Sequence, residues 1–139
     1  MRRSRRALVV LAAVVAGVAV LAAIGFFVAR PALTGPISTV TFNQSKAVPD
    51  YDGAEYTITE ESRLAELAAL FDEHNAVPEL VSISNLGTCS GGTSTTAEIT
   101  FSSGRVARMQ LTKCGEGDGP FGDFVDEATD LFSSWKDGR

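Results

Sequence analysis

The first thirty residues contain a long apolar segment. Residues 7–29 include no charged residue, no strongly polar residue and no proline, and only Gly17 and Gly25 interrupt the apolar character. As a helix with a rise of about 1.5 Å per residue, the segment would span roughly 34 Å, against about 30 Å for the hydrocarbon core of a bilayer. A cleavable signal has a shorter apolar region of roughly 7–15 residues. We therefore predict an uncleaved transmembrane helix over residues 7–29, and the alternative is a protein secreted after signal cleavage.

Basic residues flank this segment unequally. Residues 1–6 contain four arginines, whereas Arg30 alone follows the apolar segment directly. Positive charge is retained on the cytoplasmic side of a membrane. The pattern predicts a single-pass protein of the cell membrane, with a cytoplasmic basic N-terminus over residues 1–6. Residues 30–36 hold two prolines and a glycine, which predicts a short linker to an extracytoplasmic domain over residues 37–139.

Short segments after the linker have the pattern of β-strands. Their apolar residues alternate with polar ones or form a short apolar run, as expected for strands with one or both faces buried. Five segments show this pattern: 37–43, 54–59, 80–86, 95–102 and 105–112. The last two flank a short turn at Ser103 and Gly104, which predicts a β-hairpin.

Two further segments have the periodicity of amphipathic helices. Thr59 is the predicted N-cap of the first helix, which ends before Pro78, and Asp123 is the predicted N-cap of the second. The apolar faces consist of Leu64, Leu67, Ala68, Leu70 and Phe71 in the first helix and of Phe121, Phe124, Val125, Ala128, Leu131, Phe132 and Trp135 in the second. The element order ββαβββα predicts an α+β domain, in which both helices cover one face of a mostly antiparallel sheet of about five strands.

Charge narrows the range of partners. The chain carries a net charge of −5, but five of its twelve basic residues lie in the first thirty residues, and residues 31–139 hold seven Lys and Arg against all seventeen Asp and Glu. Nucleic-acid binding requires clustered positive charge on the protein surface. We therefore expect no nucleic-acid partner, and the acidic domain favours a cationic or neutral protein partner.

Cys89 and Cys114 are the only two cysteines. Both lie on the predicted extracytoplasmic side, where disulfides persist, and they flank the predicted hairpin in glycine-rich sequence. We predict a structural disulfide between them, with free or metal-bound thiols as alternatives. A catalytic role for Cys89, between Gly87 and Gly91, would require a helix directly after that turn and a nearby base. The sequence continues instead with glycine, threonine and serine.

Carboxylates in two glycine-containing loops are weak candidates for cation binding. They are Asp50, Asp52, Glu116 and Asp118. Neither loop has the ligand spacing of an EF-hand, and turn or capping roles explain such residues equally well. His74, the only histidine, lacks a second histidine or a cysteine pair at the spacing of zinc sites. We therefore assign no catalytic residue, no metal ligand and no cofactor from the sequence.

The function has to be inferred from this architecture, because no sequence motif specifies a reaction. The anchor is rich in alanine, valine and flanking arginine, a composition typical of GC-rich bacterial genomes. We expect a membrane-anchored extracytoplasmic domain of a bacterial envelope protein, acting as a non-enzymatic module that binds a protein or another envelope component. The alternatives are a small envelope enzyme and a cation or ligand sensor that uses the glycine-rich loops.

Overall fold

The chain divides into two units. The computed structural model describes residues 14–25, 35–46, 48, 50–84, 91–115 and 119–138. The first unit comprises Met1–Leu33 and the second Thr34–Arg139. Residues 14–25 of the first unit form a helix. Of the helices in the described ranges, none is both long enough and apolar enough to cross a bilayer. The predicted transmembrane segment 7–29 begins and ends outside those ranges, so the anchor stays a prediction.

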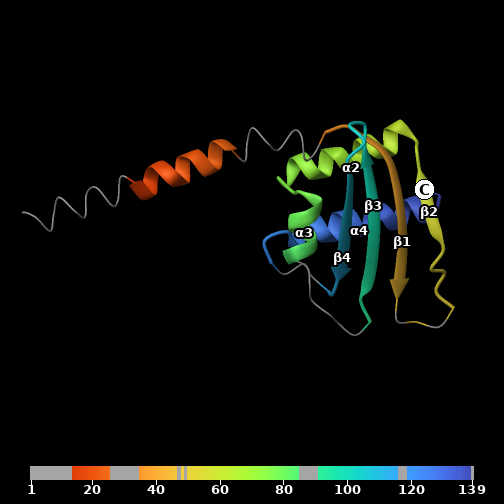
Figure 1. The fold of residues 1–139 in the computed structure, drawn as a ribbon. Helices are drawn as coiled ribbons and strands as arrows, with labels where there is room; N and C mark the ends of the chain where they lie inside the picture. Colours follow the sequence, from red (N-terminus) through yellow and green to blue (C-terminus); the bar gives the residue numbers. More distant parts are fainter. Residues whose placement is uncertain are drawn as a thin grey trace, which may run out of the picture. The chain divides into compact units, whose positions relative to one another are not determined.

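The second unit is built on a four-stranded antiparallel sheet. Its strands are β1 (Ile37–Lys46), β2 (Glu55–Ile58), β3 (Thr93–Phe101) and β4 (Val106–Lys113). They lie side by side in the order β2-β1-β3-β4 (Figure 1). β1 therefore pairs both with the strand that follows it and with β3, which comes after two intervening helices. The predicted hairpin is confirmed, and Gly104 in its turn has a φ of +83°, a conformation that glycine adopts without steric cost.

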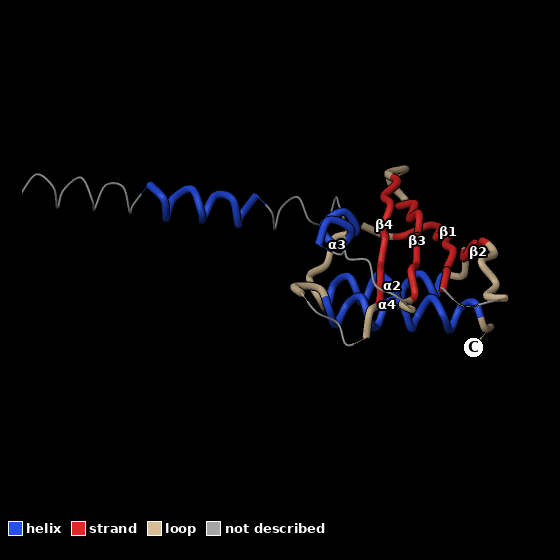
Figure 2. The backbone as a smooth tube through the Cα atoms, turned by 90° about the horizontal axis from the view of Figure 1, so that it is seen from below, coloured by secondary structure: helices blue, strands red, loops and turns tan. Residues whose placement is uncertain are grey.

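Two helices cover one face of this sheet. α2 (Glu61–Glu73) and α4 (Gly122–Lys136) cross the strands on the same side, whereas the short α3 (Pro78–Ser84) lies beyond β4 (Figure 2). The predicted apolar faces of the two long helices are confirmed, because the buried residues of α2 all belong to the first and those of α4 belong to the second, except for Gly122 and Thr129. The predicted α+β class with an antiparallel sheet is confirmed as well.

The core lies between the sheet and α2 and α4. Phe42 of β1 packs against Phe132 of α4 with ring centroids 4.8 Å apart, and Phe71 of α2 stacks on Phe124 of α4 at 5.2 Å. The first pair joins the sheet to the helical layer, and the second joins the two helices within that layer. The other large apolar side chains that are fully buried are Leu67, Ile99, Met109, Leu111, Val40 and Val81.

The predicted strand over residues 80–86 is wrong, because Pro78–Ser84 forms α3. Pro78 occupies the first helical position, where its missing N–H costs nothing, and Glu79 is an acidic residue of the first turn. Of the apolar residues in the segment, Val81 is fully buried while Ile83 is 68% exposed. So short an apolar run carries too few positions to distinguish a helix from a strand. The sheet accordingly has four strands.

The role of α3 is to cover the outer edge of β4. The Gln110 N–H donates a hydrogen bond to Ser82 Oγ at 3.0 Å, and the Ser82 hydroxyl donates to the Pro78 carbonyl at 2.9 Å. The Arg105 guanidinium in the hairpin turn forms an ion pair with Glu79 of α3. An edge strand exposes unpaired backbone groups that invite pairing with another chain. The helix and its serine satisfy one of those groups.

Both predicted N-caps are also wrong. α2 begins after Glu60 and α4 after Phe121, and neither N-cap residue makes a side-chain capping hydrogen bond. The Glu60 carboxylate instead contacts the Arg63 guanidinium, with Oε2 2.7 Å from Nε. Asp123 lies inside the first turn of α4, where its charge still favours the positive end of the helix dipole.

Candidate functional site

The face of the sheet opposite α2 and α4, here called the open face, is polar. Along each strand its residues alternate with buried ones, as the pleat of a β-sheet requires. Val106 is its one apolar side chain among the described residues. The open face consists of Thr39, Thr41, Asn43 and Ser45 on β1, Glu55 and Thr57 on β2, Ser94, Thr96, Glu98 and Thr100 on β3, and Val106, Arg108, Gln110 and Thr112 on β4.

Cross-strand pairs order the side chains of the open face. The Thr41 and Thr57 hydroxyl oxygens lie 3.3 Å apart within hydrogen-bond distance. Arg108 donates from Nε to Glu98 Oε2 at 3.1 Å across the β3–β4 pair. Threonine is also stiff at χ1 because it is β-branched. These contacts and the restricted threonine rotamers limit the orientations of several polar groups on this face.

A hollow of about 420 Å³ lies on this face. Its lining offers hydroxyl groups, an amide, two carboxylates and one guanidinium, so it can both donate and accept hydrogen bonds. The lining residues are Thr41, Phe42, Asn43, Glu55, Thr96, Ala97, Glu98 and Arg108. The arrangement is suited to holding a polar ligand or a polar segment of a partner.

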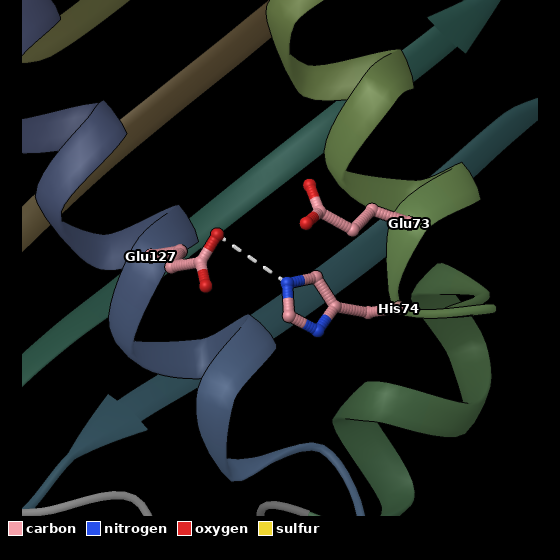
Figure 3. Close-up of side chains that lie close together, drawn as sticks. All are labelled: Glu73, His74 and Glu127. Atoms are coloured by element: carbon pink, nitrogen blue, oxygen red, sulfur yellow. Dashed lines mark ion pairs between the residues drawn. The ribbon is translucent and has the colours of Figure 1, made fainter.

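A second group of polar side chains lies on the helical side of the domain. His74 is the residue at which α2 ends, Glu73 directly precedes it, and Glu127 projects from α4 toward the imidazole (Figure 3). His74 Nε2 and Glu127 Oε2 are 3.3 Å apart. One ligand atom from each of the three side chains can be chosen so that all lie within 4.8 Å of one another. The chain turns sharply after this point, with Asn75 at a φ of +49°.

The imidazole of His74 is mostly enclosed. The side chain is 18% exposed, and its ring meets the Phe124 ring edge to face at 5.9 Å. Nε2 is inaccessible to solvent and makes no hydrogen bond with any residue that the structure describes. A small hollow of about 100 Å³ is lined by His74 and residues 119–124.

The two predicted cation candidates that the structure describes, Asp50 and Asp52, do not join this group. Asp52 accepts hydrogen bonds from the Tyr56 hydroxyl at 2.7 Å and from the Ala54 N–H at 3.0 Å. These two bonds lower the pKa of Asp52, the tyrosine contributing most. Asp50 is exposed and adopts a φ of +59°. The cluster close enough to hold a metal ion, among the described residues, contains neither aspartate.

The remaining candidates depend on residues outside the described ranges. Glu116 and Asp118 both lie there, and so does Cys89. Cys114 follows β4 and is exposed. The disulfide between the two cysteines and the cation site at the second loop therefore stay predictions.

The structure also reveals a buried polar residue, Gln44, one position beyond the end of the predicted strand 37–43. Gln44 is 1% exposed and lies on the covered face, where its amide nitrogen is 3.1 Å from Thr95 Oγ1 and 3.2 Å from the Thr129 carbonyl oxygen. Its own carbonyl accepts a bond from the Tyr51 hydroxyl at 3.4 Å. Val40, Phe42 and Gln44 share one face by the period-two rule, so extending the predicted strand 37–43 would have placed Gln44 inside.

Comparison with known proteins adds no relative, since no family model, no curated protein and no solved structure matches this chain. The functional argument therefore depends on the geometry of the chain itself.

Proposed function

We propose that this protein is a membrane-anchored component of a bacterial envelope, and that its extracytoplasmic domain binds a protein or another envelope component without catalysing a reaction. The open face of the sheet is the proposed binding surface. The observation that carries the proposal is the polar hollow on that face, lined from β1, β2, β3 and β4. The apolar segment 7–29 and the arginines before it support the anchor and the orientation.

The rigidity of the open face favours binding. Its threonines have restricted χ1 angles, and the cross-strand pairs restrict their neighbours further. Ordering flexible side chains at an interface costs about 0.5–1.5 kcal/mol for each one. A surface whose donors and acceptors are already ordered avoids most of that cost, so a polar face of this kind can bind with useful affinity.

The charges of the hollow indicate which partner it would accept. Glu98 and Arg108 form an ion pair on the surface, and such exposed pairs contribute little to stability. Glu55 adds a second carboxylate to the lining. The hollow therefore carries net negative charge, which favours a neutral polar partner or a cationic one. Association with a cationic partner should weaken as salt rises, because salt screens exposed charges over about 8–10 Å.

Site-specific photo-crosslinking in intact cells tests the proposed surface. A photoreactive amino acid placed in the full chain at Thr96 or Gln110 lies on the open face, and one placed at Ala65 or Ala69 lies on the exposed side of α2. We expect a discrete crosslinked product from the first two positions and none from the second two. Equal products from both surfaces, or none from the open face, would contradict the proposal.

The anchor is tested separately by sequencing the N-terminus of the protein isolated from membranes. An uncleaved anchor leaves the chain starting at or next to Met1. A mature start between Ala23 and Gly35 would instead show that the signal is removed and that the domain is secreted.

A further inference from the structure

Three side chains of types that can ligate a metal lie together where α2 ends against α4. The proposed binding surface on the open face does not include them. Glu73 and His74 are adjacent in sequence, whereas Glu127 lies on another helix. Their nearest ligand atoms lie within 4.8 Å of one another. We propose that Glu73, His74 and Glu127 bind one Zn²⁺ ion, with water completing the coordination. The proposal is independent of the binding surface on the open face.

The closest measured distance fits a shared metal ion. Zinc binds histidine nitrogen and carboxylate oxygen at about 2.0–2.2 Å, in tetrahedral geometry. Two ligands of such a tetrahedron are separated by about 3.3–3.6 Å. His74 Nε2 and Glu127 Oε2 are 3.3 Å apart. Glu73 is exposed, so its side chain can move the remaining distance without disturbing the core.

The state of His74 Nε2 provides a second observation. This nitrogen is inaccessible to solvent and lacks a hydrogen bond to any described residue. Leaving a buried polar atom without a partner costs about 1–3 kcal/mol. Its present contact with Glu127 is an ion pair at 3.3 Å without hydrogen-bond geometry, and a metal ion between the two side chains would give the nitrogen a direct ligand bond. The edge-to-face contact with Phe124 at 5.9 Å meanwhile restricts the ring to a limited range of orientations.

The ligand set selects zinc over the hard cations. Ca²⁺ takes six to eight oxygen ligands, and Mg²⁺ also prefers oxygen and keeps several waters. One imidazole nitrogen and two carboxylate oxygens suit Zn²⁺, which uses both kinds of ligand. The two carboxylates also balance the charge of the ion. Three protein ligands leave a fourth position that water can occupy.

A bound ion would link two helices that meet through side-chain packing. The ligands come from the C-terminal end of α2 and from α4. Binding to the folded state alone raises stability by mass action. We therefore expect zinc binding to raise the stability of the second unit.

The test uses the full chain, metal-free and without a histidine-containing tag, titrated with ZnCl₂ by calorimetry. We expect one ion per chain. We also expect saturating zinc to raise the thermal unfolding midpoint by about 4 °C or more. His74→Ala and Glu127→Gln should each weaken binding at least tenfold, because losing a direct ligand costs no less than losing a second-sphere partner. CaCl₂ at the same concentration should not raise the midpoint.

Matched variants separate this site from others. Glu61→Gln removes the same charge from an exposed position at the other end of α2, and it should bind zinc as the native chain does. Cys89→Ser/Cys114→Ser excludes thiol ligands and should also retain binding. His74→Ala and Glu127→Gln must each keep their thermal midpoints in the absence of zinc within a few degrees, which shows that a lost binding signal is not lost folding.

Nitrogen-15 spectroscopy identifies the ligand atom. Because the chain has one histidine, its imidazole spectrum contains the signals of His74 alone, and zinc should shift Nε2 more than Nδ1. Absence of binding, binding that survives both His74→Ala and Glu127→Gln, or binding that disappears only in the cysteine variant would each overturn the proposal.

Discussion

The two faces of the four-stranded sheet are made by the same strands, yet they differ in almost every property. Phe42 is buried against α4, whereas the adjacent Thr41 lies on the open face. On β4, Met109 is buried and the adjacent Arg108 is exposed. Side chains alternate between the faces at every residue of a strand. One residue can therefore pack in the core while the next is exposed on the open face, and the two roles need not share a position.

This comparison teaches where the energy of the fold resides. Fully burying a large apolar side chain contributes about 1.5–3 kcal/mol. Substitutions at exposed positions usually change stability by less than about 0.5 kcal/mol. The covered face therefore determines whether the domain folds, and the open face can change its chemistry at little cost in stability. Three predictions examine this contrast.

The largest effect is expected from Phe42→Ala. Phe42 is 1% exposed and contacts the rings of Tyr56, Phe132 and Trp135. Its truncation should lower the free energy of unfolding by about 3–5 kcal/mol, because a cavity replaces these contacts. Thr41→Ala on the open face should cost less than about 1 kcal/mol.

Chemical denaturation of the full chain measures both variants, with the fluorescence of Trp135 as the signal, since the chain has one tryptophan. Similar losses for the two variants would contradict the separation of the two faces.

A smaller effect is expected at Gln44, the largest of the polar side chains buried on the covered face. Gln44→Leu keeps the side-chain size but leaves Thr95 and Tyr51 without their present hydrogen-bond partner. Unsatisfied buried polar groups cost about 1–3 kcal/mol, and we expect a loss of that size. Gln110→Leu makes the same chemical change on the open face and should alter stability by less than about 0.5 kcal/mol. A neutral or stabilising Gln44→Leu would show that the buried amide is replaceable by packing.

The smallest effect is expected from Tyr56→Phe, and it should depend on pH. The Tyr56 hydroxyl donates to Asp52, which lowers the pKa of Asp52 from its ordinary 3.8 and raises that of Tyr56 from 10.0. The bond stabilises the fold fully above pH 3.8 and below pH 10.0. Its contribution is lost as the pH falls through the lowered pKa of Asp52 or rises through the raised pKa of Tyr56.

The unfolding midpoints of the native chain and Tyr56→Phe should therefore differ fully between pH 3.8 and pH 10.0, and the difference should shrink as the pH falls below 3.8 or rises above 10.0. The ring that stacks on Phe42 is retained in this variant, so the comparison isolates the loss of the hydroxyl group from any loss of aromatic packing. A difference that is independent of pH would assign the effect to something other than the hydrogen bond.

Local periodicity made part of this fold predictable. The hairpin and the buried faces of α2 and α4 follow from repeats of two and 3.6 residues, which need no knowledge of the partner layer. α3 could not be predicted from the sequence, because Pro78–Ser84 buries few side chains and its conformation depends on docking to β4 through Ser82. The order of the strands in the sheet could not be predicted either, since it depends on long-range pairing of β1 with β3.

The candidate sites were less predictable than the fold. The sequence places His74 at the end of a helix, but nothing in it brings Glu127 to within 3.3 Å of the imidazole. Helix periodicity indicates which side of α4 faces outward, and the crossing of two helices then decides which outward residues meet. The hollow on the open face likewise requires the register of all four strands.

The treatment of the sheet edges bears on how such a domain can evolve. One edge strand, β2, is only four residues long, and the other, β4, is engaged by the serine of α3. Main-chain pairing would accept almost any extended peptide, because backbone groups are the same in every sequence. With both edges restricted, the proposed recognition depends on the side chains of the open face. Descendants of this chain can then acquire new partners by single substitutions at alternate positions of the strands, while the buried positions between them preserve the fold.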